Sequence, residues 1–177
     1  AALALEFVCY SLLNSFSQAC TTFVGQNSGA SNLGRCKKAL KVALIEDAII
    51  TIVMIVLVVW QGRTILALFS SDAEVLDIAY VRVCMLFPAY VFSMAYENMS
   101  GYLRGFGISA LPSALTAIGV CGTRFFWALA VFPVHPTFAT VMVAYPVSFC
   151  TTALLIAGAL VYCKPAQQAM RPKTATS

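Results

Sequence analysis

Charged side chains are scarce in this sequence, and their scarcity excludes several classes of protein at once. Lys, Arg, Asp and Glu make up 10% of the 177 residues, whereas about 25% is usual in a soluble domain. The 11 basic and 7 acidic residues are too few to cover a globule of this length, and 60% of the sequence is hydrophobic. This composition excludes a soluble globular enzyme, a disordered chain and a disulfide-rich secreted domain. It predicts a polytopic membrane protein.

The signatures of catalysis and of metal binding are also missing from the sequence. Seven cysteines include no C-x-x-C pair, and most of them fall in apolar stretches, where cysteine acts as a small apolar residue. The single histidine, His135, lies in a proline-bracketed turn and is expected to be exposed. No glycine-rich phosphate loop, nucleophile elbow or pair of catalytic carboxylates is present. We therefore predict no enzyme, no catalytic residue, no metal site and no nucleic-acid partner.

Apolar stretches long enough to cross a bilayer, which takes about 20 residues, occur five times. They lie at about 2–24, 42–69, 75–103, 112–132 and 137–162. The sequence predicts an all-α, polytopic transmembrane helix bundle of five spanning helices over residues 1–163, followed by a cytoplasmic tail over 164–177. The segment 25–34 is rich in Gly, Asn and Ser and is expected to form a loop, a helix end or a hinge. The third stretch is longer than needed and is expected to tilt, to kink at Pro88 or to begin outside the membrane.

The basic residues predict the orientation of the helices, because cytoplasmic loops carry an excess of Lys and Arg. If the helices alternate in direction, eight basic residues fall on one side and two on the other, with Arg124 inside the fourth helix. The eight are Arg35, Lys37, Lys38, Lys41, Arg104, Lys164, Arg171 and Lys173. This side is expected to be cytoplasmic, with the C-terminus inside the cell and the N-terminus outside. No initiator Met or signal peptide is visible at Ala1, so we expect further residues to precede it.

Polar residues inside the predicted helices are the candidates for function, because they are costly in lipid and face other helices or cavities. In the first helix a stripe with spacings of 3, 4, 3 and 4 predicts either hydrogen bonding between helices or the wall of a hydrated path. Its members are Ser11, Asn14, Gln18, Thr21 and Gly25. Gly101 and Gly105 fit the small-x-x-x-small pattern of closely packed helices.

A second polar stripe, in the third helix, contains the most informative carboxylate. Its members are Ser93, Glu97, Ser100 and Arg104. Glu97 is expected either to form a structural ion pair with Arg104 or Arg124, or to exchange protons or bind a cation during transport. Arg124 cannot easily lose its proton, so it should pair with a carboxylate or extend towards an interface. Glu46 and Asp47 are expected either at headgroup level, opposite Lys37, Lys38 and Lys41, or at a helix start that they stabilise.

Five segments of the sequence, in order, are similar to one family of transporters. They are FSQACTTFVGQNSGA at 16–30, LFSSDAEV at 68–75, ENMSGYLRGFGISALP at 97–112, GVCGTRFFW at 119–127 and YPVS at 145–148. Together they resemble the multidrug and toxic compound extrusion (MATE) family over residues 6–152. The resemblance implies twelve helices in two six-helix lobes around a cavity, with this chain at helices eight to twelve and the N-terminal lobe outside it.

The resemblance also implies a function. It suggests a secondary active efflux transporter of the plasma membrane that exchanges H+ or Na+ for small organic, often cationic, drugs, with no other cofactor. Glu97 would respond to the coupling ion, with Arg124 and Arg104 as charge partners. The candidates for lining the cavity are Asn14, Gln18, Thr21 and Ser93. Members that use sodium carry an aspartate whose place falls near Ser93 here, so their sodium site does not carry over.

Two other functions are compatible with the same sequence. A flippase for lipid-linked saccharides, from a related branch, would keep the fold, but it would favour a wide cationic cavity for which Arg124 is the only buried cation identified. A non-transporting membrane subunit would act through helix packing, in keeping with the five-helix count.

Overall fold

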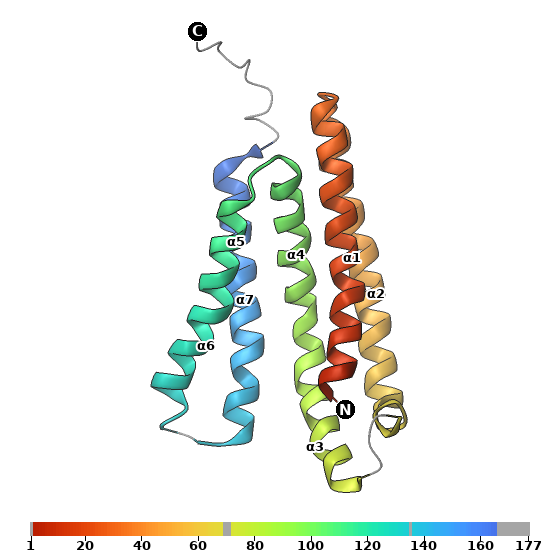
Figure 1. The fold of residues 1–177 in the computed structure, drawn as a ribbon, viewed down its shortest axis with the longest axis vertical. Helices are drawn as coiled ribbons and strands as arrows, with labels where there is room; N and C mark the ends of the chain where they lie inside the picture. Colours follow the sequence, from red (N-terminus) through yellow and green to blue (C-terminus); the bar gives the residue numbers. More distant parts are fainter. Residues whose placement is uncertain (1, 69–71, 135, 166–177) are drawn as a thin grey trace.

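The chain forms a bundle of five helical rods in a computed structural model that describes residues 2–68, 72–134 and 136–165 (Figure 1). The first two rods are α1 (Ala2–Gly29) and α2 (Leu33–Ala67). The third joins α3 (Ala73–Leu86), a 3-10 turn η1 (Phe87–Ala89) and α4 (Tyr90–Gly105). The fourth joins α5 (Ala110–Ala117), the π-helical turn η2 (Ile118–Gly122), α6 (Thr123–Phe126) and a second π-helical turn η3 (Trp127–Val131). The fifth is α7 (Phe138–Cys163).

The predicted all-α class and the count of five helices are confirmed. Among the described residues, four rods are long and apolar enough to cross a membrane: Leu33–Ala67, Ala73–Gly105, Ala110–Val131 and Phe138–Cys163. The remaining rod, α1, is 28 residues long but carries the polar residues that contact α4. It runs alongside α2 and α4 (Figure 1). His135 and residues 166–177 of the expected tail lie outside the described residues.

The first two helices extend further than the sequence pattern indicates. Of the alternatives expected for residues 25–29, the structure has the helix end, because α1 continues to Gly29. The helix α2 begins at Leu33, before the apolar stretch that starts near residue 42. The turn between them is short: Ser31 takes a left-handed conformation with φ of 57°, and the Asn32 N–H donates to the Asn27 carbonyl oxygen at 2.8 Å. Polar residues of low helix propensity are tolerated here because the adjacent apolar helices supply most of the stability.

The third rod is interrupted at Pro88, one of the accommodations expected for its length. Proline has no N–H and its ring clashes with the preceding turn, so the chain forms the short 3-10 turn η1 before continuing as α4. At the start of the rod, the Asp72 carboxylate accepts a hydrogen bond from the Glu74 N–H at 3.0 Å. Asp72 is therefore the N-cap of α3.

The helix α4 lies at the centre of the bundle and packs against α1, α2 and α7. Its contact with α1 is close because two glycines face that helix. A Cβ atom on Gly101 would lie 2.6 Å from the Ser17 carbonyl oxygen, and one on Gly105 would lie 2.7 Å from Val24 Cβ. The small-x-x-x-small pattern at these glycines thus marks a true helix contact.

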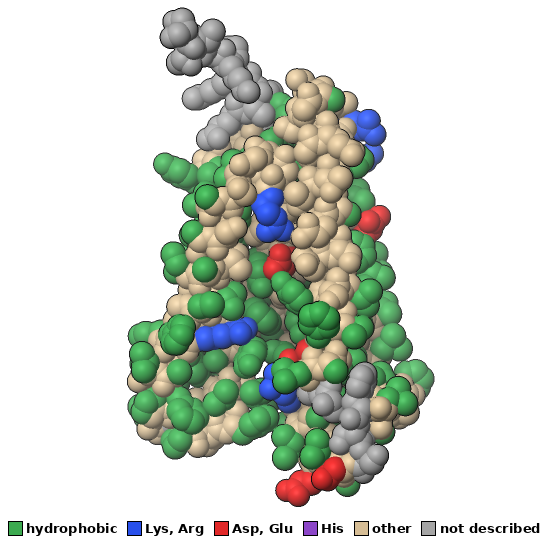
Figure 2. All heavy atoms as spheres, viewed as in Figure 1, with side chains coloured by type: hydrophobic (Ala, Val, Ile, Leu, Met, Phe, Trp, Pro, Cys, Tyr) green, Lys and Arg blue, Asp and Glu red, His purple; other side chains and the backbone are tan. Residues whose placement is uncertain are grey.

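The outer surface of the bundle is largely apolar. Large hydrophobic side chains such as Trp60, Leu129 and Tyr162 are more than 75% exposed. In the face drawn in Figure 2, hydrophobic side chains cover the flanks, while a few basic and acidic ones lie along the middle. A surface of this kind suits contact with lipid or with other membrane helices.

Candidate functional site

The Glu97 carboxylate lies between α4 and α1. The Tyr10 hydroxyl donates to its Oε1 at 2.9 Å, and Arg104 Nη2 lies 3.9 Å from its Oε2. The side chains of Arg104 and Glu97 are 27% and 12% exposed. The structure therefore brings Glu97 together with one of the two arginines expected to pair with it. The carboxylate is thus held by one cation and one hydroxyl and is partly open to the outside.

Ser17 of α1 links the charged pair to the backbone of α4. Its hydroxyl donates to the Glu97 carbonyl oxygen at 2.7 Å and accepts a hydrogen bond from Arg104 Nη2 at 2.8 Å. One turn later, the Thr21 hydroxyl contacts the Gly101 carbonyl oxygen at 3.0 Å. These contacts require the close approach of α1 and α4 that Gly101 permits. The geometry of the charged site therefore depends on this glycine.

The stripe of α1 that faces α4 differs by about one residue from the stripe expected. Thr21 lies on the contact face, but Gln18 and Ser11 are exposed and Asn14 is half-buried. The Ser11 hydroxyl donates to the Phe7 carbonyl oxygen at 2.8 Å, within its own helix. Polar residues of α1 thus need no partner helix, so their spacing alone does not define the contact face. That Asn14, Gln18 and Thr21 line a cavity stays a prediction.

Ser93, the fourth residue expected to line a cavity, is buried in α4. Its hydroxyl lies 3.5 Å from the Tyr96 hydroxyl, and it is 1% exposed. It lies one turn of helix before Glu97, on the side of the 3-10 turn.

Arg124 contacts α7 rather than the Glu97 carboxylate. Its Nε donates to Ser148 Oγ at 3.2 Å. Its guanidinium lies 4.2 Å from the centre of the Tyr145 ring and 5.5 Å from that of Phe149. None of the ion pairs in the described part of the chain includes Arg124. Aromatic rings attract a cation through their quadrupole, so they replace the carboxylate expected as its partner.

A second buried ion pair, which the sequence analysis missed, joins α1 to α3. Arg82 donates from Nε and Nη2 to the two oxygens of Glu6, at 2.7 and 3.0 Å. The Arg82 guanidinium also lies 5.8 Å from the centre of the Tyr145 ring, so this ring contacts two arginines. The available signal was the position of Glu6, four residues before Tyr10 and on the same helical face.

Asp47 lies within α2 rather than at a helix start, and none of the ion pairs among the described residues includes it. It is fully buried between α2 and α4, where the Asn98 side-chain amide donates to its Oδ2. Because α2 begins at Leu33 and rises about 1.5 Å per residue, Asp47 lies about 21 Å from the start of the helix. Its expected depth at the lipid headgroups stays a prediction.

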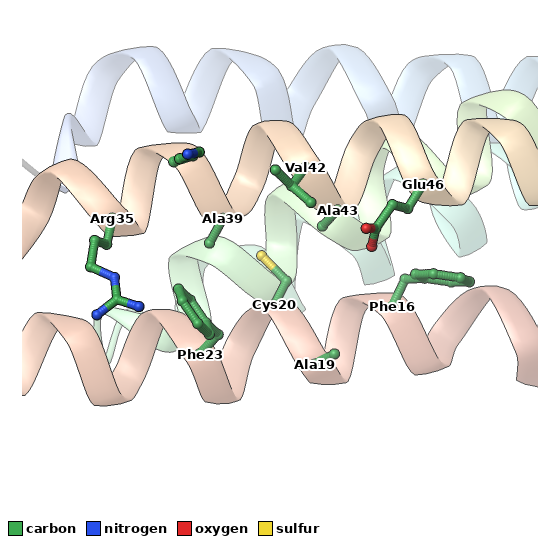
Figure 3. A pocket seen from close by; sticks show the side chains of 10 residues that line it. Phe16, Ala19, Cys20, Phe23, Arg35, Ala39, Val42, Ala43 and Glu46 are labelled. Atoms are coloured by element: carbon green, nitrogen blue, oxygen red, sulfur yellow. The ribbon is translucent and has the colours of Figure 1, made fainter.

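A groove between α1 and α2 has a volume of about 410 Å³ (Figure 3). Phe16, Phe23, Arg35 and Glu46 are among its lining residues. The Arg35 guanidinium lies 5.6 Å from the centre of the Phe23 ring. The groove uses a different face of α1 from the one that contacts Glu97, and it is therefore separate from the charged site.

The fold and the site together define a multi-pass helical membrane protein with charged groups held between its helices. Comparison with known proteins identifies its family. The MatE family model matches residues 1–130. The chain therefore belongs to the MATE family, which its sequence motifs resemble.

Individual relatives are similar at low identity and over part of their length. The probable multidrug resistance protein YoeA of Bacillus subtilis (strain 168) is 26% identical over 147 residues, which cover 81% of this chain and 31% of that protein. Multidrug and toxin extrusion protein 1 of Mus musculus is 26% identical over 119 residues, 65% of this chain and 20% of that protein. The crystal structure of the eukaryotic MATE transporter AtDTX14 matches with a TM-score of 0.78 and 22% identity, over 95% of this chain and 38% of that one. The chain thus spans well under half the length of these relatives.

Proposed function

We propose that this chain supplies helices eight to twelve, most of the C-terminal lobe, of an ion-driven multidrug efflux transporter. The transporter exchanges H+ or Na+ for small organic, often cationic, compounds across the plasma membrane. Its other partners are membrane lipid and the N-terminal lobe of the same parent protein. The observation that carries the proposal is the half-buried Glu97 carboxylate between α1 and α4, in a chain of the MATE family.

The contacts of Glu97 suggest how ion binding changes the lobe. When the carboxylate is charged, it accepts a hydrogen bond from the Tyr10 hydroxyl of α1. It also attracts Arg104 of its own helix, which in turn donates to Ser17 of α1, so the carboxylate stabilises the contact between α4 and α1. A proton or Na+ on the carboxylate removes the net attraction for Arg104. Less free energy is then needed to move α1 relative to α4. Ion binding therefore favours one state of the transporter over the other. Rocking of two lobes about a midplane site turns this difference into exchange.

The test replaces Glu97 by Gln in the parent protein, which keeps the shape and removes the charge. We expect E97Q to insert in the membrane normally and to lose ion-driven efflux of a fluorescent cationic dye from vesicles. E74Q is the matched control. Glu74 is exposed in the first turn of α3, far from Glu97, so its substitution should leave efflux unchanged. Normal efflux by E97Q would remove the assigned role. Imposing the H+ and Na+ gradients separately identifies the coupling ion.

The positions of the basic residues support a cytoplasmic location for the described end of α7. The start of α2 with Arg35, Lys37, Lys38 and Lys41, the end of α4 with Arg104, and Lys164 after α7 lie at the same end of the bundle (Figure 1). A reporter protein that works only in the cytoplasm should be active when it is fused after Ser177. Activity of a reporter that works only outside the cell would reverse the orientation.

A further inference from the structure

A buried polar cluster between α2 and α4 lies apart from the Glu97 site. It consists of Asp47 and Thr51, one turn apart on α2, and Asn98 on α4. All three residues are 0% exposed. The Asn98 amide donates one hydrogen bond to Asp47 Oδ2 and another to the Met94 carbonyl oxygen at 3.0 Å.

Three oxygen atoms of this cluster make no hydrogen bond of good geometry among the described residues: Asp47 Oδ1, Thr51 Oγ1 and Asn98 Oδ1. The Thr51 hydroxyl lies near enough to the Asp47 carboxylate to interact with it. The orientation of the Asn98 amide is set by its contacts, because its two N–H donors both have acceptors. Reversing the amide would turn its oxygen towards the Met94 carbonyl oxygen, which cannot donate. The Thr51 hydroxyl carries one hydrogen and can satisfy one acceptor, whereas an ionised Asp47 Oδ1 and the Asn98 Oδ1 can only accept. The cluster is therefore one hydrogen atom short.

No basic side chain of the described residues pairs with Asp47. On its own helix, Lys41 lies about 9 Å away along the axis and is exposed, as is Glu46 beside the groove. The helices packed against α2 present Cys20 on α1, Tyr80 on α3, and Tyr102 and Glu97 on α4. Cys20 and Tyr102 belong to an apolar cluster, Tyr80 donates to the Val59 carbonyl oxygen at the other end of α2, and Glu97 is directed to α1. Burying an ionised carboxylate without a paired cation in such surroundings has a large unfavourable free energy.

We propose that Asp47 is a second proton-binding site of this chain, and that it holds a proton on Oδ1. The protonated oxygen donates to Asn98 Oδ1, while the Asn98 amide donates to Asp47 Oδ2. The two side chains then form an acid–amide pair with a hydrogen bond in each direction. One proton thereby satisfies two of the three oxygens and removes the buried charge.

The proton at Asp47 acts on a different helix contact from an ion at Glu97. Asn98 and Glu97 are adjacent in α4, yet Asn98 contacts α2 and Glu97 contacts α1. The protonated pair stabilises the α2–α4 contact, whereas a neutral Glu97 loosens the α1–α4 contact. The two sites use different carboxyl groups, Asp47 and Glu97. Either proposal can therefore be refuted while the other stands.

Isotope-edited infrared spectroscopy tests the proton directly in the unmodified chain. The sequence holds three aspartates, Asp47, Asp72 and Asp77. Asp72 and Asp77 are exposed, and Asp77 pairs with Arg63 at 2.9 Å. With aspartate labelled by carbon-13 at its carboxyl carbon, we expect a shifted carboxylic-acid C=O band at neutral pH. Glutamates carry no label, so Glu97 cannot produce this band.

Two variants assign the band. D47N should lose the labelled band completely, and E46Q, which removes the neighbouring exposed carboxylate, should keep it. If labelled wild-type chain shows only ionised carboxylate bands at neutral pH, the proposal is wrong, whether or not D47N folds. A band that persists unchanged in D47N would equally refute it. The E97Q variant should keep the band, which separates this site from the proposed coupling site.

Discussion

Replacing Gly101 by alanine should separate α1 from α4 at the Glu97 site. The added Cβ would lie 2.6 Å from the carbonyl oxygen of Ser17 and 2.7 Å from its hydroxyl oxygen. Carbon and oxygen in contact usually lie about 3.3–3.6 Å apart, so the helices have to move apart by about 0.7–1.0 Å. Three hydrogen bonds are stretched by this movement: Ser17 to Glu97 at 2.7 Å, Arg104 to Ser17 at 2.8 Å and Thr21 to Gly101 at 3.0 Å.

The expected loss of stability follows from these contacts. Overpacking costs about 1–3 kcal/mol, and hydrogen bonds between membrane helices contribute about 0.6 kcal/mol each on average. We therefore expect G101A to lower the free energy of unfolding by about 2–4 kcal/mol, a factor of about 30 to 1,000 in the unfolding equilibrium. Reversible unfolding in mixed micelles, followed by the fluorescence of Trp60 and Trp127, measures it.

Gly158 provides the control for this substitution. It lies inside α7, and a Cβ atom there would meet nothing within 4 Å. G158A should therefore leave the free energy of unfolding unchanged or raise it by about 0.5–1 kcal/mol through helix propensity. If G101A is as stable as G158A, then α1 and α4 do not approach each other as described, and the geometry of the Glu97 site is wrong.

Three further substitutions separate buried, exposed and conformational contributions by the same unfolding measurement. E6Q should lower the free energy of unfolding by about 1–3 kcal/mol, because it breaks the charged contact with Arg82, which has two hydrogen bonds. A double-mutant cycle with R82M should give a coupling energy above experimental error, and additive effects would show that the two side chains do not interact. D77N should cost less than about 1 kcal/mol, since the Arg63 and Asp77 side chains are 69% and 64% exposed; a larger loss would contradict this. G107A should cost about 1–2 kcal/mol, because Gly107 has a φ of +82° in the turn after α4, and an unchanged stability would show that the turn adopts another conformation.

The helices were predictable from the sequence, because a bilayer demands long apolar runs and few other structures supply them. The pairing of Glu97 with Arg104 was among the expected alternatives, since the two residues share one face of α4 at a spacing of seven. The helix ends were harder to predict. Gly, Asn and Ser at 25–29 favour a loop locally, yet α1 continues through them.

Contacts between distant segments could not be predicted in the same way. Glu6 and Arg82 are 76 positions apart, and neither position identifies the other. Arg124 shows a related difficulty, because the rings of Tyr145 and Phe149 satisfy a cation without any charge. The place of Asp47 within α2 depends on where this helix begins, which the apolar pattern alone does not indicate.

The two π-helical turns of the fourth rod affect how this helix tolerates changes of length. In a π-helical turn each N–H reaches back five residues instead of four, and such turns occupy Ile118–Gly122 and Trp127–Val131. Removing one residue within either turn lets the backbone close an ordinary α-helical turn, so the flanking residues keep their angular positions. In a regular α-helix the same deletion rotates everything beyond it by about 100°. Chains one residue shorter in this segment can therefore present the same side chains to lipid and to α7.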